Sequence, residues 1–150
     1  MNLVNLDDLY QDVILDHGRK PRNFGPLPMA NREAEGYNPF CGDHVHVRIF
    51  FDEGVIREIK FEGAGCAIST ASASLMTQSV KGKTLAEAKA LFDGFHDSVV
   101  GTNPIDEEKL GSLVCLCGVK DYPNRIKCAT LAWHALIEAL EGAEEPPAKT

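Results

Sequence analysis

Alternating apolar and polar residues predict an antiparallel hairpin in the first half of the chain. Val45, Val47, Ile49 and Phe51 occupy every second position of one stretch, and Val55, Ile59 and Phe61 share one face of the next. A period of two is typical of a strand with one buried face. The polar segment 52–54, which ends in glycine, predicts the turn between the two strands. A weaker pattern at 32–36 predicts a short additional strand before this hairpin.

Apolar residues with helical spacing predict helices on both sides of the strands. The first predicted helix starts after Asn5 and ends near His17, and a helix of small residues covers 67–80. Thr84 followed by Glu87 predicts a capping box that starts another helix, which ends before the break at Asn103-Pro104. The remaining helices are expected at 106–117 and at 124–140. His96 and His134 are expected to be structural, and Trp133 is expected to anchor the core.

These elements indicate an α+β fold with a small three-stranded antiparallel sheet and helices packed on one of its faces. We expect one domain over residues 1–141, without internal repeats, and a tail without fixed structure over 142–150. The sequence of 150 residues is long enough to bury a core of its own.

Charge and composition exclude several classes of function. The chain carries 15 basic and 22 acidic residues, a net charge of −7, which argues against binding to nucleic acid or to an anionic membrane surface. No apolar run approaches the roughly 20 residues of a membrane span, and the first residues do not resemble a secretory signal. We therefore expect a cytoplasmic protein.

Three of the five cysteines stand at turns or helix starts in separate segments. Cys41 and Asp43 lead into the first hairpin strand, and Cys66 follows the second, so these three residues should converge. Cys128 lies near the start of the last helix, just after the basic residues Arg125 and Lys127. Three thiolates and a carboxylate suit a tetrahedral metal or an iron–sulfur cluster, and buried thiols without a ligand are the alternative. An odd cysteine count in a reducing compartment argues against a disulfide framework.

Other polar residues have simpler interpretations. Cys115 and Cys117 form a CxC pair that we interpret as buried thiols, with a redox role as the alternative. His44 and His46 share one strand face; either could reach the metal, but we expect both to face solvent. Gly63 and Gly65 allow a tight turn before Cys66, and without a Walker lysine they do not indicate nucleotide binding.

Three segments together resemble the U-type iron–sulfur cluster assembly family, which comprises IscU, SufU and the NifU N-terminal domain. They are Tyr37 to Asp43, Gly63 to Ser69 and Arg125 to Trp133, with the N-terminal helix and Pro21 to Gly25 as further similarity. Lys127 occupies the place of a histidine in the classical scaffolds, and the segment between Cys66 and Cys128 is longer. Both features resemble the SufU branch.

The resemblance implies a SufE/NifU-like fold and a site of Cys41, Asp43, Cys66 and Cys128 that holds zinc or a [2Fe–2S] cluster. It implies a zinc-dependent sulfurtransferase that takes persulfide sulfur from a SufS-like cysteine desulfurase, rather than a stand-alone metabolic enzyme. Cys41 is the expected sulfur acceptor, with Cys128 as the alternative. The other function that the resemblance allows is a scaffold that builds a [2Fe–2S] cluster and passes it to other assembly or acceptor proteins.

Overall fold

The structure is a computed structural model that describes residues 6–39, 42–100 and 107–142. The strands are β1 (Arg32–Asn38), β2 (Asp43–Asp52) and β3 (Val55–Ala64). The helices are α1 (Leu6–Arg19), α2 (Ala67–Val80), α3 (Leu85–Val100), α4 (Glu107–Leu110), the 3₁₀ segment η1 (Gly111–Asp121) and α5 (Pro123–Gly142). The predicted tail lies mostly outside the described residues, and α5 ends two residues beyond the predicted Leu140.

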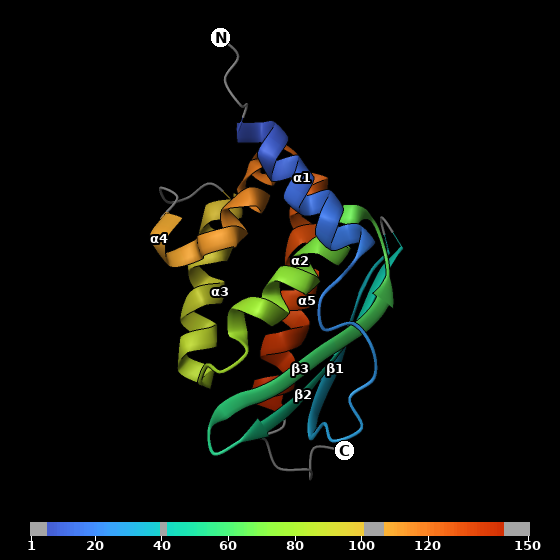
Figure 1. Ribbon diagram of the computed structural model, residues 1–150, viewed down its shortest axis with the longest axis vertical. Coiled ribbons are helices and arrows are strands. Elements are labelled where there is room, and N and C mark those ends of the chain that lie inside the picture. Colours follow the sequence, from blue (N-terminus) through green and yellow to red (C-terminus); the bar gives the residue numbers. More distant parts are fainter. Residues whose placement is uncertain (1–5, 40–41, 101–106, 143–150) are drawn as a thin grey trace.

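The three strands form one antiparallel sheet in the order β1-β2-β3, with α2 and α5 on one of its faces (Figure 1). Buried and exposed residues alternate along β2, so one face of the sheet joins the core and the other meets solvent. The predicted α+β class, the three strands and the placement of the helices are confirmed.

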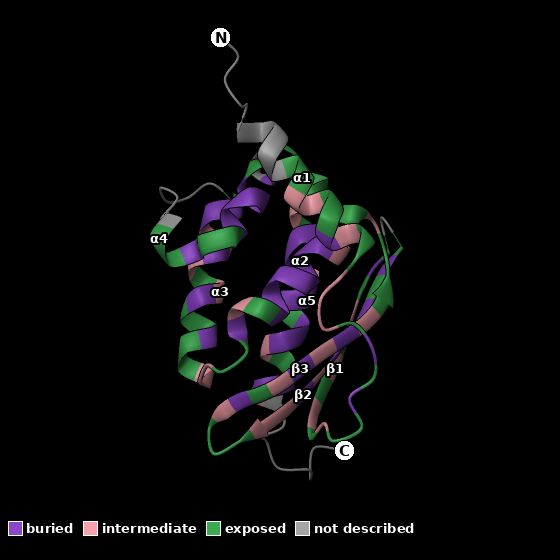
Figure 2. Cartoon of the chain, in the orientation of Figure 1, coloured by how far each residue is buried: buried purple, intermediate pink, exposed green. Residues whose placement is uncertain are grey.

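The core lies between the inner face of the sheet and the helices, where buried residues of α2 and α5 gather (Figure 2). Trp133 of α5 is fully buried, lies against Phe95 of α3, and donates its indole N–H to the hydroxyl of Ser72 in α2 at 3.2 Å. The anchoring role expected for Trp133 is confirmed. Because α2 and α5 are both fixed in this core, the residues at their N-termini are held in place as well.

The inner face of β3 differs from the predicted alternation. A register irregularity between Phe50 and Phe51 shifts the pairing, so that Phe51 faces Ile56. Ile56 is therefore buried, whereas Val55 is only half-buried. A β-bulge adds one residue to one strand and moves the following side chains to the other face, which a simple period of two does not anticipate.

The helix predicted at 106–117 is also only partly correct. Gly111 has a φ of +56°, a conformation that glycine adopts readily, and α4 ends just before it. The chain continues as the 3₁₀ segment η1, whose tighter winding leaves apolar residues at spacings close to those of an α-helix. The predicted capping box at the start of α3 is confirmed, because Thr84 and Glu87 exchange side-chain and backbone hydrogen bonds of 2.9 and 3.2 Å.

No helix in the described part of the chain combines the length and apolar character that a membrane crossing requires.

Candidate metal centre

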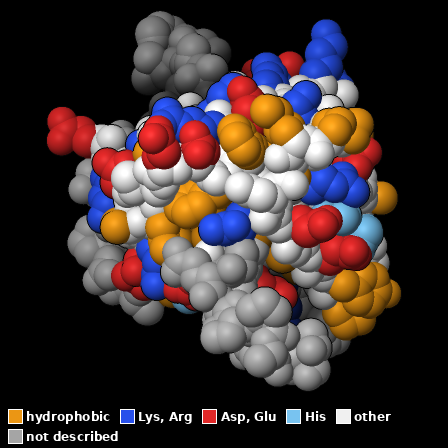
Figure 3. Space-filling model, turned by 90° about the horizontal axis from the view of Figure 1, so that it is seen from below, with side chains coloured by type: hydrophobic (Ala, Val, Ile, Leu, Met, Phe, Trp, Pro, Cys, Tyr) orange, Lys and Arg blue, Asp and Glu red, His pale blue; other side chains and the backbone are white. Residues whose placement is uncertain are grey.

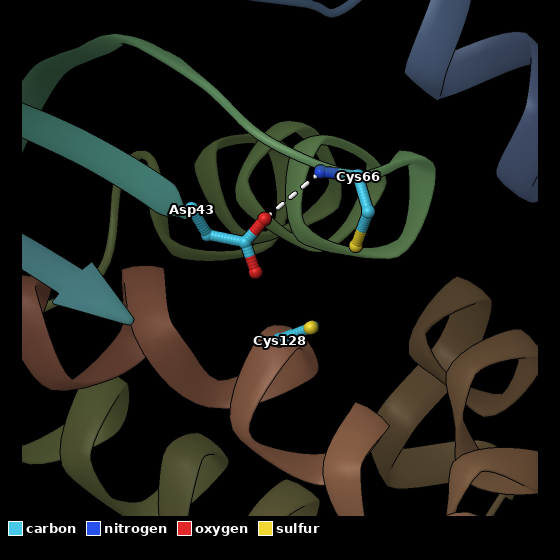
Figure 4. A group of neighbouring side chains, drawn as sticks. All are labelled: Asp43, Cys66 and Cys128. Carbon is cyan, nitrogen blue, oxygen red and sulfur yellow. Dashed lines mark hydrogen bonds between the residues drawn. The ribbon is translucent and has the colours of Figure 1, made fainter. Parts of the chain in front are cut away.

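Three segments far apart in the sequence bring Asp43, Cys66 and Cys128 together (Figure 4). Asp43 begins β2, Cys66 precedes α2, and Cys128 lies in the N-terminal part of α5. One potential ligand atom from each residue lies within 4.8 Å of those from the other two, and the three side chains point toward one another. The predicted convergence of Asp43 and Cys66 at the hairpin ends is confirmed, and α5 adds Cys128.

Asp43 is fully buried, and its two carboxylate oxygens have different surroundings. Oδ1 accepts a hydrogen bond of 2.9 Å from the backbone N–H of Cys66. Oδ2 has no hydrogen-bond partner among the described residues. A buried acceptor left without a partner costs about 1–3 kcal/mol, and a cation held between Asp43 and the two thiols would supply the missing interaction.

Cys66 is the N-cap residue of α2, and its sulfur accepts a hydrogen bond from the backbone N–H of Ser69 at 3.4 Å. A sulfur in this position satisfies one of the free N–H groups at the helix start, as an oxygen does in an ordinary N-cap. The residue is half-buried, so the site reaches solvent on this side.

Gly65 permits the close approach between Asp43 and the segment before α2. A Cβ atom at position 65 would lie only 2.6 Å from Oδ1 of Asp43. At Gly63 the φ is +150°, and a Cβ atom would lie 2.1 Å from the backbone oxygen of His44. Gly63 therefore lies within β3 and not in the predicted tight turn, and each glycine has its own steric reason for lacking a side chain.

Cys128 is fully buried. Its sulfur lies 3.8 Å from the backbone oxygen of Asn124, one helical turn earlier, and 4.0 Å from the side-chain nitrogen of Asn38 in β1. Arg125 and Lys127, which precede Cys128 in α5, are exposed. Sequence reasoning missed the contact with Asn38; the only signal was its place in the segment Tyr37 to Asp43.

The donor set fits zinc. Two thiols and one carboxylate are among the groups that bind Zn²⁺, and a fourth ligand would complete a tetrahedron. Cys41, the fourth residue of the predicted site, lies outside the described residues. The unpartnered Oδ2 of Asp43 and the convergence of both sulfurs on the same space are the structural observations consistent with a bound cation.

The histidines of β2 lie on the other face of the sheet from Asp43. His44 and His46 bond to Glu35 and Glu33 of β1, with nitrogen–oxygen distances of 3.0 and 2.6 Å. The hydrogen bond with His44 is the largest influence that holds the pKa of Glu35 below its usual value. The expectation that both histidines face solvent instead of the metal is correct for the exposed His44, whereas His46 is half-buried within this polar face.

Cys115 and Cys117 lie in η1 and are buried. Burial, reinforced by the neighbouring Cys117, raises the pKa of Cys115 to about 12. A thiol with so high a pKa is almost entirely protonated at neutral pH and reacts slowly as a nucleophile. This supports the interpretation of the pair as core thiols.

The surface beside the centre contains a pocket of about 330 Å³ between the end of β1 and α5. Asn38, Lys127, Leu131 and His134 contribute to its lining. Burial lowers the pKa of His134, so this ring is neutral at physiological pH. Acidic, basic and hydrophobic side chains are interspersed on the face of the molecule that Figure 3 shows.

The comparison with protein families matches residues 9–129 to the NifU-like N-terminal domain. The chain is 45% identical over 141 residues to the zinc-dependent sulfurtransferase SufU of Bacillus subtilis. This alignment covers 94% of this chain and 95% of that protein. It is 44% identical, also over 141 residues, to the iron–sulfur cluster assembly scaffold protein IscU of Streptococcus pyogenes, covering 94% of this chain and 88% of the relative. Among solved structures, the SUF-system scaffold candidate of Fervidobacterium islandicum superimposes with a TM-score of 0.83 at 36% identity, over 91% of this chain and all of the other.

Proposed function

Because the chain belongs to the family of NifU-like N-terminal domains, we propose that it is a zinc-bound sulfurtransferase of iron–sulfur cluster assembly. In this proposal it accepts persulfide sulfur from a SufS-like cysteine desulfurase and passes it on to other assembly or acceptor proteins. Its place of action would be the cytoplasm, where reducing conditions keep unprotected thiols from forming disulfides.

The main support for this proposal is that Asp43, Cys66 and Cys128 lie close together and that Oδ2 of Asp43 has no hydrogen-bond partner among the described residues. We assign zinc to this space, with Cys41 as the fourth ligand. When bound, zinc would keep the cysteine sulfurs deprotonated and protect them from oxidation. Asp43 would then be the weakest ligand, because an oxygen donor is harder than the thiolates.

The transfer step uses one of the cysteine thiolates as nucleophile. The thiolate attacks the outer sulfur of the desulfurase persulfide, a new sulfur–sulfur bond forms on this chain, and the old bond breaks. The desulfurase cysteine leaves as a thiolate, and the proton of the persulfide stays with the transferred sulfur. The step therefore needs no external oxidant or reductant.

Cys41 is the acceptor that we favour. It stands between Pro39 and Gly42 in the segment that connects β1 and β2, and this loop position is the reason for the choice. Cys128, the alternative, is fully buried, so a partner's persulfide could reach it only after a rearrangement of its surroundings. Cys66 caps a helix and would give up that interaction on leaving the site.

A scaffold that builds a [2Fe–2S] cluster is the second candidate, and the 44% identity to a relative named as such a scaffold favours it. Against it stands Lys127, which replaces the histidine that precedes the last cysteine in the classical scaffolds. Within this family, the loss of that histidine counts against stable cluster building. We therefore place the scaffold second.

The test is a desulfurase-coupled assay with the purified protein, free cysteine and a SufS-like desulfurase. Sulfide release under reducing conditions should rise strongly when the protein is added, and Cys41→Ala should abolish that rise. Mass spectrometry of peptides trapped with an alkylating agent should locate one added sulfur on Cys41. Full stimulation by Cys41→Ala, or sulfur on Cys128 alone, would reject Cys41 as the acceptor, and no stimulation by the unmodified protein would reject the function.

A further inference from the structure

Asn38 is a buried polar residue beside the metal centre to which the proposed mechanism gives no role. It is 4% exposed, and it ends β1 directly opposite Asp43 in the register of the sheet. Its backbone oxygen accepts the N–H of Gly42 at 2.8 Å, which closes the connection between β1 and β2. Its side-chain nitrogen reaches across to Cys128, 4.0 Å from the sulfur.

An N–H group is directed at each described residue of the centre. The N–H of Cys66 bonds Oδ1 of Asp43, and the N–H of Ser69 bonds the sulfur of Cys66. The N–H of Asn38 is the corresponding donor for Cys128. Among these three donors, it alone belongs to a side chain, so it is the one that a substitution can remove without changing the backbone.

A cysteine sulfur that holds a metal ion carries no proton, so it can only accept hydrogen bonds. The backbone oxygen of Asn124, 3.8 Å from the sulfur of Cys128, is then an acceptor facing another acceptor. The Asn38 amide carries hydrogen atoms of the opposite polarity and stabilises the charged sulfur.

Asn38 also lies between Cys128 and the neighbouring pocket. It lines that pocket of about 330 Å³ and at the same time contacts the cysteine, which has no exposed surface. Shortening the side chain would therefore connect the pocket with the sulfur of Cys128 and admit water or a small reagent.

We propose that Asn38 is a positioning residue of the metal centre, which donates a hydrogen bond to the Cys128 thiolate and shields it from the pocket. This inference rests on the proposed zinc site. It assigns Cys128 as the ligand that stays on the metal during sulfur transfer, since hydrogen bonding to a thiolate makes it less nucleophilic. Loss of an outer partner of a metal ligand typically weakens metal affinity by roughly 10–100-fold, which sets the expected scale.

The test compares Asn38→Ala, Asn38→Asp and the control Asn31→Ala. Aspartate has nearly the size of asparagine but replaces the donor by a negative charge. Asn31 is a suitable control because its side chain also ties two chain segments, through bonds of 2.8 Å to the backbone N–H and oxygen of Phe51. It precedes β1, at the other end of that strand from Asn38.

Zinc affinity is measured by competition with a coloured chelator, and Co²⁺ in place of zinc reports sulfur ligation through its charge-transfer absorption. We expect Asn38→Ala to bind zinc roughly tenfold more weakly and Asn38→Asp to bind it more weakly still. The Co²⁺ charge-transfer band should move to lower energy in both, because the sulfur loses its donor. Asn31→Ala should keep the affinity and the band even if it unfolds at lower urea concentration.

Reagent access provides a second measurement. Iodoacetamide labelling of Cys128, followed by peptide mass spectrometry, should be faster in Asn38→Ala than in the unmodified protein. Unchanged affinity, unchanged Co²⁺ absorption and unchanged labelling in both Asn38 variants would overturn the inference while leaving the zinc site intact. If the unmodified protein binds neither Zn²⁺ nor Co²⁺, the proposed function and this inference both fail.

Discussion

The backbone N–H of Cys66 donates a hydrogen bond of 2.9 Å to Oδ1 of Asp43, and this bond joins the start of α2 to the start of β2. It fixes one carboxylate oxygen and turns the other, Oδ2, toward the two sulfurs (Figure 4). Both groups of this bond belong to the chain itself, so the fold positions the carboxylate of the centre.

This relationship predicts opposite effects of Asp43→Asn on the free and the metal-loaded protein. Asparagine carries no charge, so the substitution removes a buried carboxylate with an unpartnered oxygen. The metal-free variant should therefore be at least as stable as the metal-free unmodified protein. Zinc affinity should fall by more than the roughly 10–100-fold that loss of an outer partner costs, because a ligand is lost. Urea unfolding with and without zinc gives both quantities. A variant that is less stable in both states would show that Asp43 serves the fold instead of the metal.

Gly65→Ala should disturb the same contact by steric means. The added Cβ would lie 2.6 Å from Oδ1 of Asp43, so the carboxylate or the segment before α2 must move. We expect roughly 10–100-fold weaker zinc binding. Gly118→Ala is the matched control, since a Cβ there meets nothing within 4 Å. Equal zinc affinity in the two variants would contradict the steric role of Gly65.

Replacing Cys115 and Cys117 by alanine should separate core thiols from metal-centre thiols. Both lie in the packed interior, so each substitution should lower the free energy of unfolding by roughly 1 kcal/mol or more. Zinc content and sulfur acceptance should stay as in the unmodified protein. Zinc loss at unchanged stability would assign the pair to the metal chemistry.

His17 should make the stability of the fold depend on pH. Its ring is buried against α2, 2.7 Å from the hydroxyl of Ser74, and burial lowers its pKa below the usual value near 6.5. The unfolded chain therefore takes up a proton at a pH where the folded one does not, and stability falls as the pH drops from about 6.5 through the lowered pKa. His17→Gln should flatten this part of the urea-unfolding profile.

Ser74→Ala serves as the control for that pH profile. It removes the hydrogen-bond partner but leaves the ring buried, and burial is the main cause of the lowered pKa. The variant should lose about 1 kcal/mol at every pH and keep the slope of the unmodified protein. An equally steep profile in His17→Gln would assign the pH dependence to other groups.

The sequence predicts best those elements that depend on residues close together in the chain. The hairpin, α2 and the capping box of α3 depend on short patterns, and their boundaries were predicted closely. The shared position of Asp43 and Cys66 followed from the hairpin alone, because the ends of two paired strands must be neighbours.

What sequence reasoning missed depends on contacts between distant segments. The bulge at Phe50 and Phe51, which brings Ile56 into the core, arises from pairing between strands, so a pattern along one strand does not contain it. The contact of Asn38 with Cys128 joins β1 to α5 across 90 positions. Only the packing of α5 against the sheet brings these two residues together.

The most direct test of the zinc-bound sulfurtransferase is the metal content of the protein purified without tag and without oxygen. Zinc, iron and acid-labile sulfide are measured per chain, together with the visible spectrum. The account predicts about one zinc per chain, no iron and no colour, with zinc lost in Asp43→Ala, Cys66→Ala and Cys128→Ala. Iron with matching sulfide and a brown absorption would identify a cluster scaffold instead, and a folded protein without metal would contradict the centre itself.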